Sequence, residues 1–120
     1  MCGVCSYMHD LRVAHLDLSL ENVVLSRDYR VAKLIDFGLA LPVSRDAAGK
    51  EHISGRGSRG KLFYVAPEVF TEQAFVATVA DVWSLGIMLF MMLTGCTLFC
   101  ASVPRHPLLL TCLVRPQPLR

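Results

Sequence analysis

The apolar residues at the start of the chain recur with the period of a helix. Four of them fall on one stripe of such a helix: Val4, Tyr7, Met8 and Leu11. This spacing predicts an amphipathic helix over residues 1–13 that packs through this stripe.

A different pattern follows, made of short runs rich in branched apolar residues. Asn22–Ser26 and Arg30–Ile35 have the composition of strands, and the polar segment 27–29 between them is typical of a turn. We therefore expect a β-hairpin. Residues 42–60 are polar and contain several glycines, which predicts one long surface loop. Loops of that length inside compact domains are usually functional.

The longest apolar run, Val82–Val103, contains no charged residue. Its length alone meets the criterion for a membrane span. However, Gly95 is placed as a C-terminal cap, so the helix itself would run from Asp81 to Thr94. At ~1.5 Å per residue such a helix is about 21 Å long, which is short of a hydrocarbon core of about 30 Å. We predict a buried helix and no membrane span.

Composition and charge narrow the function classes only slightly. Hydrophobic residues make up 53% of the chain, and the formal charge is +2. So small a charge does not favour binding to nucleic acid or to an anionic membrane. No secretory leader is recognisable at the start, which favours a cytoplasmic protein with free thiols. Zinc binding by the pairs Cys2/Cys5 and Cys96/Cys100 would require all four sulfurs to converge, and their surroundings do not favour this.

Four short stretches of sequence carry the candidate chemistry. His15–Asn22 reads HLDLSLEN, and Asp36–Gly38 reads DFG directly after a predicted strand. Residues 60–68 read GKLFYVAPE, and Asp81–Gly86 reads DVWSLG at the start of the predicted long helix. Each motif is weak alone. In this order and spacing they resemble the eukaryotic protein kinase family, of serine/threonine type. By this resemblance His15–Asn22 corresponds to the catalytic loop of the family, and it is given that name below.

The resemblance covers residues 1–99 and implies an α+β fold. It corresponds to a mainly helical fragment of the kinase large lobe, with a short β-hairpin and an incomplete domain. Residues 100–120 do not clearly match the family and, being rich in proline, are expected to form an irregular tail. The glycine loop and ATP-binding lysine of the small lobe would lie upstream of the catalytic loop. The chain alone is therefore expected to be inactive; the alternative is a non-catalytic, pseudokinase-like binding fragment.

The resemblance also implies phosphoryl transfer from Mg-ATP to serine or threonine hydroxyls of a protein substrate. Asp17 would accept the proton of the attacking hydroxyl, and Asn22 and Asp36 would hold Mg²⁺, whose preferred ligands are oxygens. Val24 would contact adenine. ATP and Mg²⁺ are the cofactors that the family implies.

Other positions would have packing roles in such a fold. His15 and Phe37 would stack in a hydrophobic column, and Asp81 would anchor the backbone of the catalytic loop. Met88 and Met92 would continue the column into the long helix, although ordinary core packing predicts the same contacts.

Three positions of the candidate site depart from the family pattern. Leu16 stands where regulated kinases carry an arginine that binds a phosphate on the activation segment. Ser19 stands where serine/threonine kinases carry a catalytic lysine, so we expect the rate to suffer and Ser19→Lys to raise it. Lys61 stands where a threonine commonly contacts the catalytic aspartate.

Overall fold

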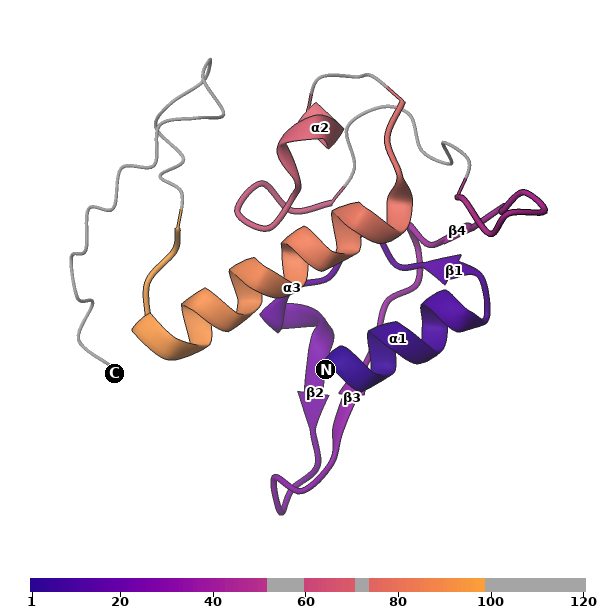
Figure 1. Cartoon of the computed structure of the whole chain (residues 1–120). Helices are drawn as coiled ribbons and strands as arrows, with labels where there is room; N and C mark the ends of the chain where they lie inside the picture. Colours follow the sequence, from indigo (N-terminus) through magenta and orange to yellow (C-terminus); the bar gives the residue numbers. More distant parts are fainter. Residues whose placement is uncertain (52–59, 71–73, 99–120) are drawn as a thin grey trace.

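The computed structural model describes residues 1–51, 60–70 and 74–98. It combines helices with short antiparallel strands (Figure 1). In chain order the elements are α1 (Cys2–Asp10), β1 (Val13–Ala14), the 3₁₀-helix η1 (Leu20–Asn22), β2 (Val23–Leu25), β3 (Ala32–Leu34), β4 (Leu41–Pro42), α2 (Pro67–Phe70) and α3 (Ala77–Thr94).

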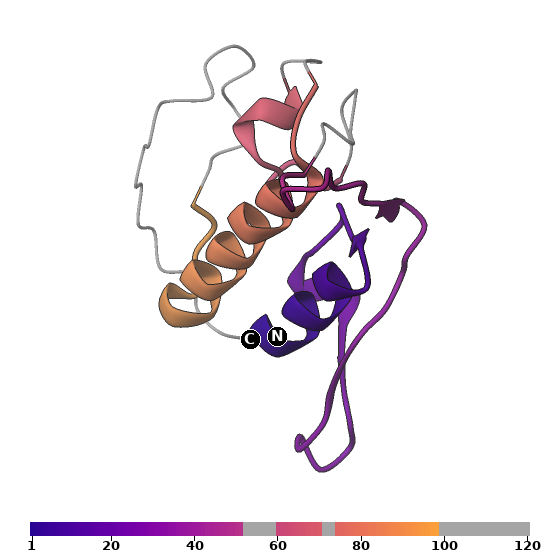
Figure 2. The ribbon, with the colours of Figure 1, turned by 45° about the vertical axis from the view of Figure 1, so that its right-hand side comes forward.

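The long helix α3 organises the molecule, and α1 and β1 both pack against it. Two views show α3 running past α1 and the strands (Figures 1 and 2). The helix ends at Thr94, as predicted, because Gly95 adopts the left-handed conformation with φ of 69° and its amide donates to the carbonyl of Met91. It begins at Ala77 instead of Asp81, so it is longer than the sequence predicts.

The prediction that α3 is buried is correct for one face only. Asp81, Ile87 and Met88 are buried, whereas Val82 and Leu93 are exposed. The helix has 18 residues and a mean hydropathy of 1.6, and 33% of it is buried. By length and composition it could cross a membrane, so the length of the helix does not distinguish a buried helix from a membrane span.

Helix α1 packs through only one residue of the predicted stripe, Met8. Cys5 and Met8 are buried against α3 and the catalytic loop, but Val4, Tyr7 and Leu11 are exposed. The helix ends at Asp10 instead of continuing to residue 13, and β1 follows at once. The position of α3, which the local pattern does not encode, decides which side of α1 is covered.

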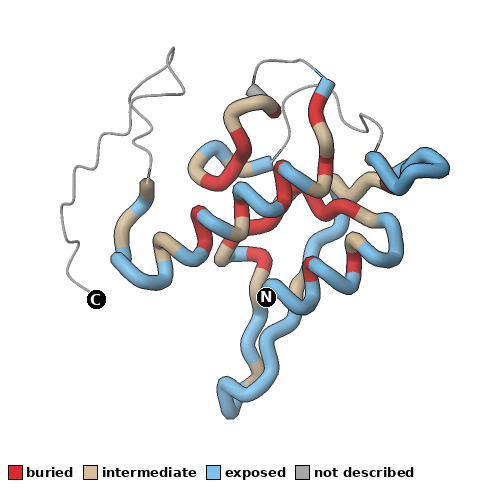
Figure 3. The backbone as a smooth tube through the Cα atoms, viewed as in Figure 1, coloured by how far each residue is buried: buried red, intermediate tan, exposed pale blue. Residues whose placement is uncertain are grey.

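The predicted hairpin is present with shorter strands. β2 pairs antiparallel with β3 in the register Val23↔Leu34, Val24↔Lys33 and Leu25↔Ala32. Its far end is exposed and projects from the rest of the described structure (Figure 3). The β1–β4 pairing was not predicted, and it places the start of the expected loop 42–60 in a strand. Residues 52–59 of that loop lie outside the described residues, as do residues 99–120.

Two groups of buried side chains form the core. The first lies around the segment after residue 60 and contains Ala14, Leu16, Val43, Val65, Ala66, Val69, Phe75, Ala77 and Ala80. The second joins α1, the catalytic loop and α3 and contains Cys5, Met8, Leu18, Tyr64, Ile87 and Met88. The catalytic loop contributes Leu16 to the first group and Leu18 to the second, so the packing of both groups fixes its position.

Candidate active site

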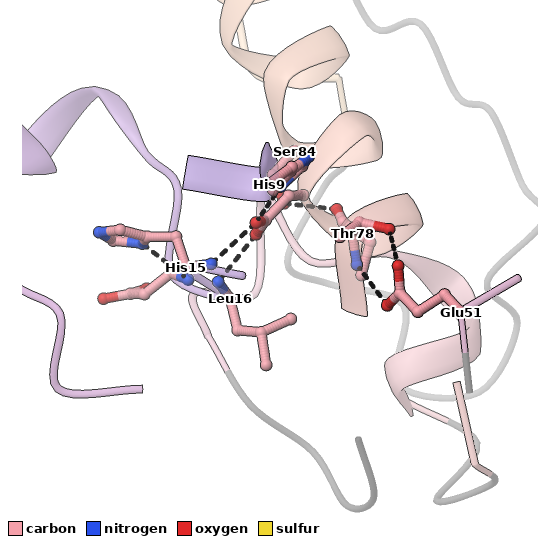
Figure 4. Close-up of polar contacts among 9 residues, drawn as sticks. His9, His15, Leu16, Glu51, Thr78 and Ser84 are labelled. Carbon is pink, nitrogen blue, oxygen red and sulfur yellow. Dashed lines mark hydrogen bonds and ion pairs between the residues drawn. The ribbon is translucent and has the colours of Figure 1, made fainter. Parts of the chain in front are cut away.

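A carboxylate buried in α3 holds the catalytic loop by its backbone. Asp81 is 0% exposed and accepts hydrogen bonds from the amides of His15 and Leu16, each at 2.8 Å. The amides of these two residues and the contacts they make are drawn in Figure 4. The predicted anchoring role of Asp81 is confirmed. Sequence reasoning missed a third partner, His9, whose Nε2 lies 2.9 Å from the same carboxylate.

The candidate base Asp17 is held by side chains from two segments. The Nδ2 group of Asn22 donates to the Asp17 carbonyl at 2.8 Å and to its Oδ2 at 2.9 Å. The Nζ of Lys61 donates to the same Oδ2 at 3.2 Å. Asp17 is thus fixed in direction, and both of these side-chain contacts are made through Oδ2. The role of Asp17 as the base stays a prediction.

The β2–β3 hairpin brings the segment with Asp36 next to the catalytic loop. The amide of Ile35 donates to the carbonyl of Asn22 at 2.9 Å, which extends the pairing beyond the end of β3. The His15 ring lies with Nε2 3.2 Å from the Ile35 carbonyl and stacks edge-on against Phe37 with centroids 4.8 Å apart. The predicted His15–Phe37 contact is confirmed.

The side chains of Asn22 and Asp36 fit the expected Mg²⁺ ligands. Asn22 binds Asp17 through its amide nitrogen, so its Oδ1, the atom of this side chain that could coordinate a cation, takes no part in that contact. Asp36 is exposed, with φ of 63°, and accepts from the Gly38 amide at 3.2 Å through Oδ1. Its second oxygen can bind a hard cation.

Within the described ranges, no cluster of three or more His, Cys, Asp or Glu side chains could hold a metal. Cys2 is exposed, Cys5 is buried and Cys96 is partly exposed. Cys100, the remaining member of the two pairs weighed above, lies outside the described residues.

The other predicted contact residues have mixed outcomes. Met88 is buried, but Met92 is 57% exposed, so the prediction that Met92 extends the hydrophobic column is wrong. The neighbouring Met91 packs against the second core group, so Met92 lies on the other side of the same turn. Val24 is 47% exposed on β2, and its contact with adenine stays a prediction.

The structure gives the departure at Leu16 a physical reason. The side chain is 8% exposed and packs in the first core group with Val43 and Val65. A guanidinium in that apolar group would be desolvated, which is costly for a charge without a partner. The position therefore serves core packing in this chain.

Ser19 and Lys61 belong to one polar network. Ser19 is 0% exposed, and its Oγ accepts a hydrogen bond from Lys61 Nζ at 3.0 Å. The pKa of Glu21 is lowered overall. Burial raises this pKa, but hydrogen bonds from its own amide and from the hydroxyls of Tyr64 and Ser19 lower it by more, and the charge of Lys61 adds to this lowering. Burial and the bond to Glu21 raise the pKa of Tyr64.

Sequence reasoning missed this network as a unit. The available signal was the simultaneous change of residue type at positions 19 and 61. The segment after residue 60 is connected to the rest of the site through this network, and it therefore belongs to the site as much as the catalytic loop does.

A second link ties the segment before residue 52 to α3. The Glu51 carboxylate accepts from the Thr78 amide at 3.3 Å and also from the Thr78 hydroxyl (Figure 4). Val76, at the N-cap of α3, has no side-chain oxygen, so Glu51 supplies the missing cap to the first turn.

Comparison with known proteins gives the site its context. A family model described as protein kinase domain matches residues 1–109, which reaches past the boundary at residue 99 expected from the motifs. The serine/threonine-protein kinase ppk25 of Schizosaccharomyces pombe is 37% identical over 89 residues, which are 74% of this chain and 20% of that protein.

Two further relatives agree. The testis-specific serine/threonine-protein kinase 2 of Mus musculus is 40% identical over 95 residues, 79% of this chain and 26% of that kinase. The CBL-interacting serine/threonine-protein kinase 1 of Arabidopsis thaliana is 41% identical over 95 residues, 78% of this chain and 20% of that kinase. The chain thus spans about a fifth to a quarter of the length of these relatives. With its family-model match, its relatives and a loop built around Asp17, Asn22 and Asp81, the chain belongs to the eukaryotic serine/threonine protein kinase family.

Proposed function

We propose that this chain is the part of a kinase large lobe that performs phosphoryl transfer from Mg-ATP to serine or threonine hydroxyls of proteins. The observation that carries the proposal is the geometry at Asp17. A carboxylate held by Asn22 at 2.9 Å, on a backbone pinned by a buried Asp81, is oriented in advance for its task. The non-catalytic alternative has no such observation in its favour.

In this reaction the substrate hydroxyl oxygen bonds to the γ-phosphorus of ATP while the bond from that phosphorus to the β–γ bridging oxygen breaks. ADP leaves with the electron pair, and the hydroxyl proton passes to Asp17. Asn22 and Asp36 would hold Mg²⁺, which supplies charge neutralisation on the phosphates when bound.

The test uses a hybrid kinase. Residues of this chain replace the 95-residue segment of the mouse testis-specific kinase 2 to which they align. We expect the hybrid to phosphorylate a serine/threonine peptide. Asp17→Asn and Asp36→Asn should each lower kcat by about 100-fold or more, because the base or a metal ligand is lost.

The exposed Asp10 of α1 provides a matched control, and Asp10→Asn should leave kcat unchanged. Near-normal turnover of Asp17→Asn or Asp36→Asn would contradict the assigned roles. An inactive hybrid would contradict the proposed function itself.

We also propose that the 120-residue chain alone binds Mg-ATP weakly. Val24 and Asp36 face solvent, and water competes for a cation in such an open site. Calorimetric titration of the chain with Mg-ATP is the measurement. Micromolar affinity of a folded monomer would contradict this proposal.

A further inference from the structure

The ammonium group of Lys61 lies inside the candidate site although its segment follows the catalytic loop by many residues. Its Nζ is 3.2 Å from Asp17 Oδ2 and 3.0 Å from Ser19 Oγ. Among the residues that the structure describes, it is the one cation paired with Asp17. A positive charge next to the base also lies near the place where phosphoryl transfer develops negative charge.

The backbone around Lys61 is firmly placed. Gly60 has φ of 88°, and a Cβ atom there would lie 2.8 Å from the Leu16 carbonyl oxygen, so the segment passes directly over the catalytic loop. The Lys61 carbonyl accepts from the amides of Tyr64 and Val65 at 2.9 and 3.1 Å. The position of the ammonium is thus built into the fold.

Ser19 and Lys61 carry the same two kinds of group as the family pattern, a hydroxyl and an ammonium, but at exchanged positions. In that pattern the lysine stands at position 19 and the threonine hydroxyl at position 61. Here the cation comes from position 61 and the hydroxyl from position 19, and the two groups touch at 3.0 Å.

We propose that Lys61 is the catalytic cation of this site and contacts the transferred phosphoryl group, which Ser19 alone could not do. The proposal rests on the proposed function. A lysine ammonium has three N–H donors, and Asp17 and Ser19 account for two of them. The side chain is 37% exposed, so the third donor can reach a phosphate oxygen that approaches from solvent.

The balance of the transfer step is unchanged by this assignment. The hydroxyl proton still passes to Asp17 and ADP still leaves with the electron pair, while Lys61 stabilises charge on the phosphoryl oxygens without changing its own protonation. The assignment reverses one expectation drawn from the sequence. Because a cation is already present, Ser19→Lys alone would place two ammonium groups together, and we expect it to lower activity.

The experiment is a cycle of variants in the hybrid kinase. Lys61→Met removes the charge and keeps much of the side-chain volume, and it should lower kcat about 100-fold with little change in the KM for ATP. Lys61→Arg should retain more activity than Lys61→Met. Lys33→Met, at an exposed lysine of β3, is the control and should have no effect.

The exchange of the two positions gives the sharpest comparison. Lys61→Thr should lose activity, and Ser19→Lys combined with Lys61→Thr should recover it, because the cation is then supplied from position 19. A second measurement avoids turnover. Lys61→Met should weaken binding of Mg-ADP with aluminium fluoride, which mimics the transferred phosphoryl group, far more than binding of Mg-ATP.

Each outcome bears on one proposal. If the unaltered hybrid is active and Lys61→Met keeps its kcat and its affinity for the fluoride complex, the role of Lys61 is refuted while the kinase function stands. If only the exchanged double variant is active, the site needs its cation at position 19, so Lys61 does not act as the cation and the unaltered chain does not transfer phosphate. If the hybrid and the exchanged variant are both inactive, the proposed function fails, and the role of Lys61 fails with it.

Discussion

At the scale of single residues, backbone conformation explains several identities at the site. Leu16 and Asp36 both have φ of 63°, and Gly60 has φ of 88°. Residues with a side chain pay a free-energy cost in this region, and such strain persists where the surrounding structure fixes it. Leu16 is fixed by Asp81 and by the core, and Gly60 is fixed by its approach to the Leu16 carbonyl.

Gly60 provides a direct test of this close approach. Gly60→Ala should lower the free energy of unfolding by about 2 kcal/mol, because a Cβ meets backbone and the conformation is left-handed. Gly86→Ala is the matched control: a Cβ there meets nothing within 4 Å, and helix propensity should raise stability by up to ~1 kcal/mol. Urea denaturation measures both variants. Equal stability of the two would contradict the packing of residues 60–61 on the catalytic loop.

Cys5 should make stability depend on pH in the alkaline range. Burial, with a smaller effect of Asp81, raises the pKa of this thiol from 9.0 to about 11. The folded state therefore favours the neutral thiol, and this stabilisation is complete below pH 9.0 and is lost as the pH rises towards 11. The slope of unfolding free energy should reach about −1.4 kcal/mol per pH unit.

The effect of Cys5 can be separated from that of Tyr64, whose pKa is also raised. Cys5→Ala should flatten the alkaline slope, although it lowers stability at every pH by leaving a small cavity. Denaturation curves between pH 8 and about 11 measure the slope of the unfolding free energy. An unchanged slope in Cys5→Ala would show that the Cys5 thiol is not its cause.

At the scale of elements, the sequence predicted what local chemistry encodes. The β2–β3 hairpin and the end of α3 at Gly95 depend on nearby residues, and both are present. Asp17, Asn22 and Asp36 were found through motifs, and the structure places the first two in contact. The β1–β4 ribbon was missed because two-residue strands have no detectable period.

The predicted start of α3, and the predicted face of α1 apart from Met8, were wrong for a related reason. Which side of α1 is covered depends on α3, far along the chain, and the first turn of α3 is capped by Glu51 instead of a local residue. Tertiary contacts of this kind leave no mark on a local pattern. The Ser19–Lys61 contact was missed in the same way, although the changes at both positions were visible.

Asp81 connects two elements, and its removal tests that connection. Asp81→Ala should lower the unfolding free energy by about 3–5 kcal/mol, because two buried amides and His9 lose their acceptor. Hydrogen exchange of the His15 and Leu16 amides should accelerate most. Asp10→Asn, on the exposed end of α1, should change neither quantity. Unchanged protection of these amides in Asp81→Ala would show that another group holds the loop.

At the scale of the whole molecule, the described structure leaves one face of α3 open. Five large apolar side chains of this helix are more than half exposed: Val79, Val82, Leu89, Met92 and Leu93. Extended apolar surface of this kind marks an interaction site or a tendency to aggregate. The buried face, by contrast, is fixed by Asp81 and by the two core groups.

We therefore expect the 120-residue chain to self-associate through α3. Leu89 and Leu93 are 53% and 77% exposed and lie one turn apart on the same side of the helix. Replacing both with glutamate should shift the chain towards monomer without lowering its melting temperature, since neither side chain is part of the core. Sedimentation velocity over a range of concentrations measures the change. Tyr29→Asn, which removes an 80% exposed aromatic side chain from the hairpin turn, is the control and should leave association unchanged. Association of the double variant equal to that of the unaltered chain would show that a surface other than α3 is responsible.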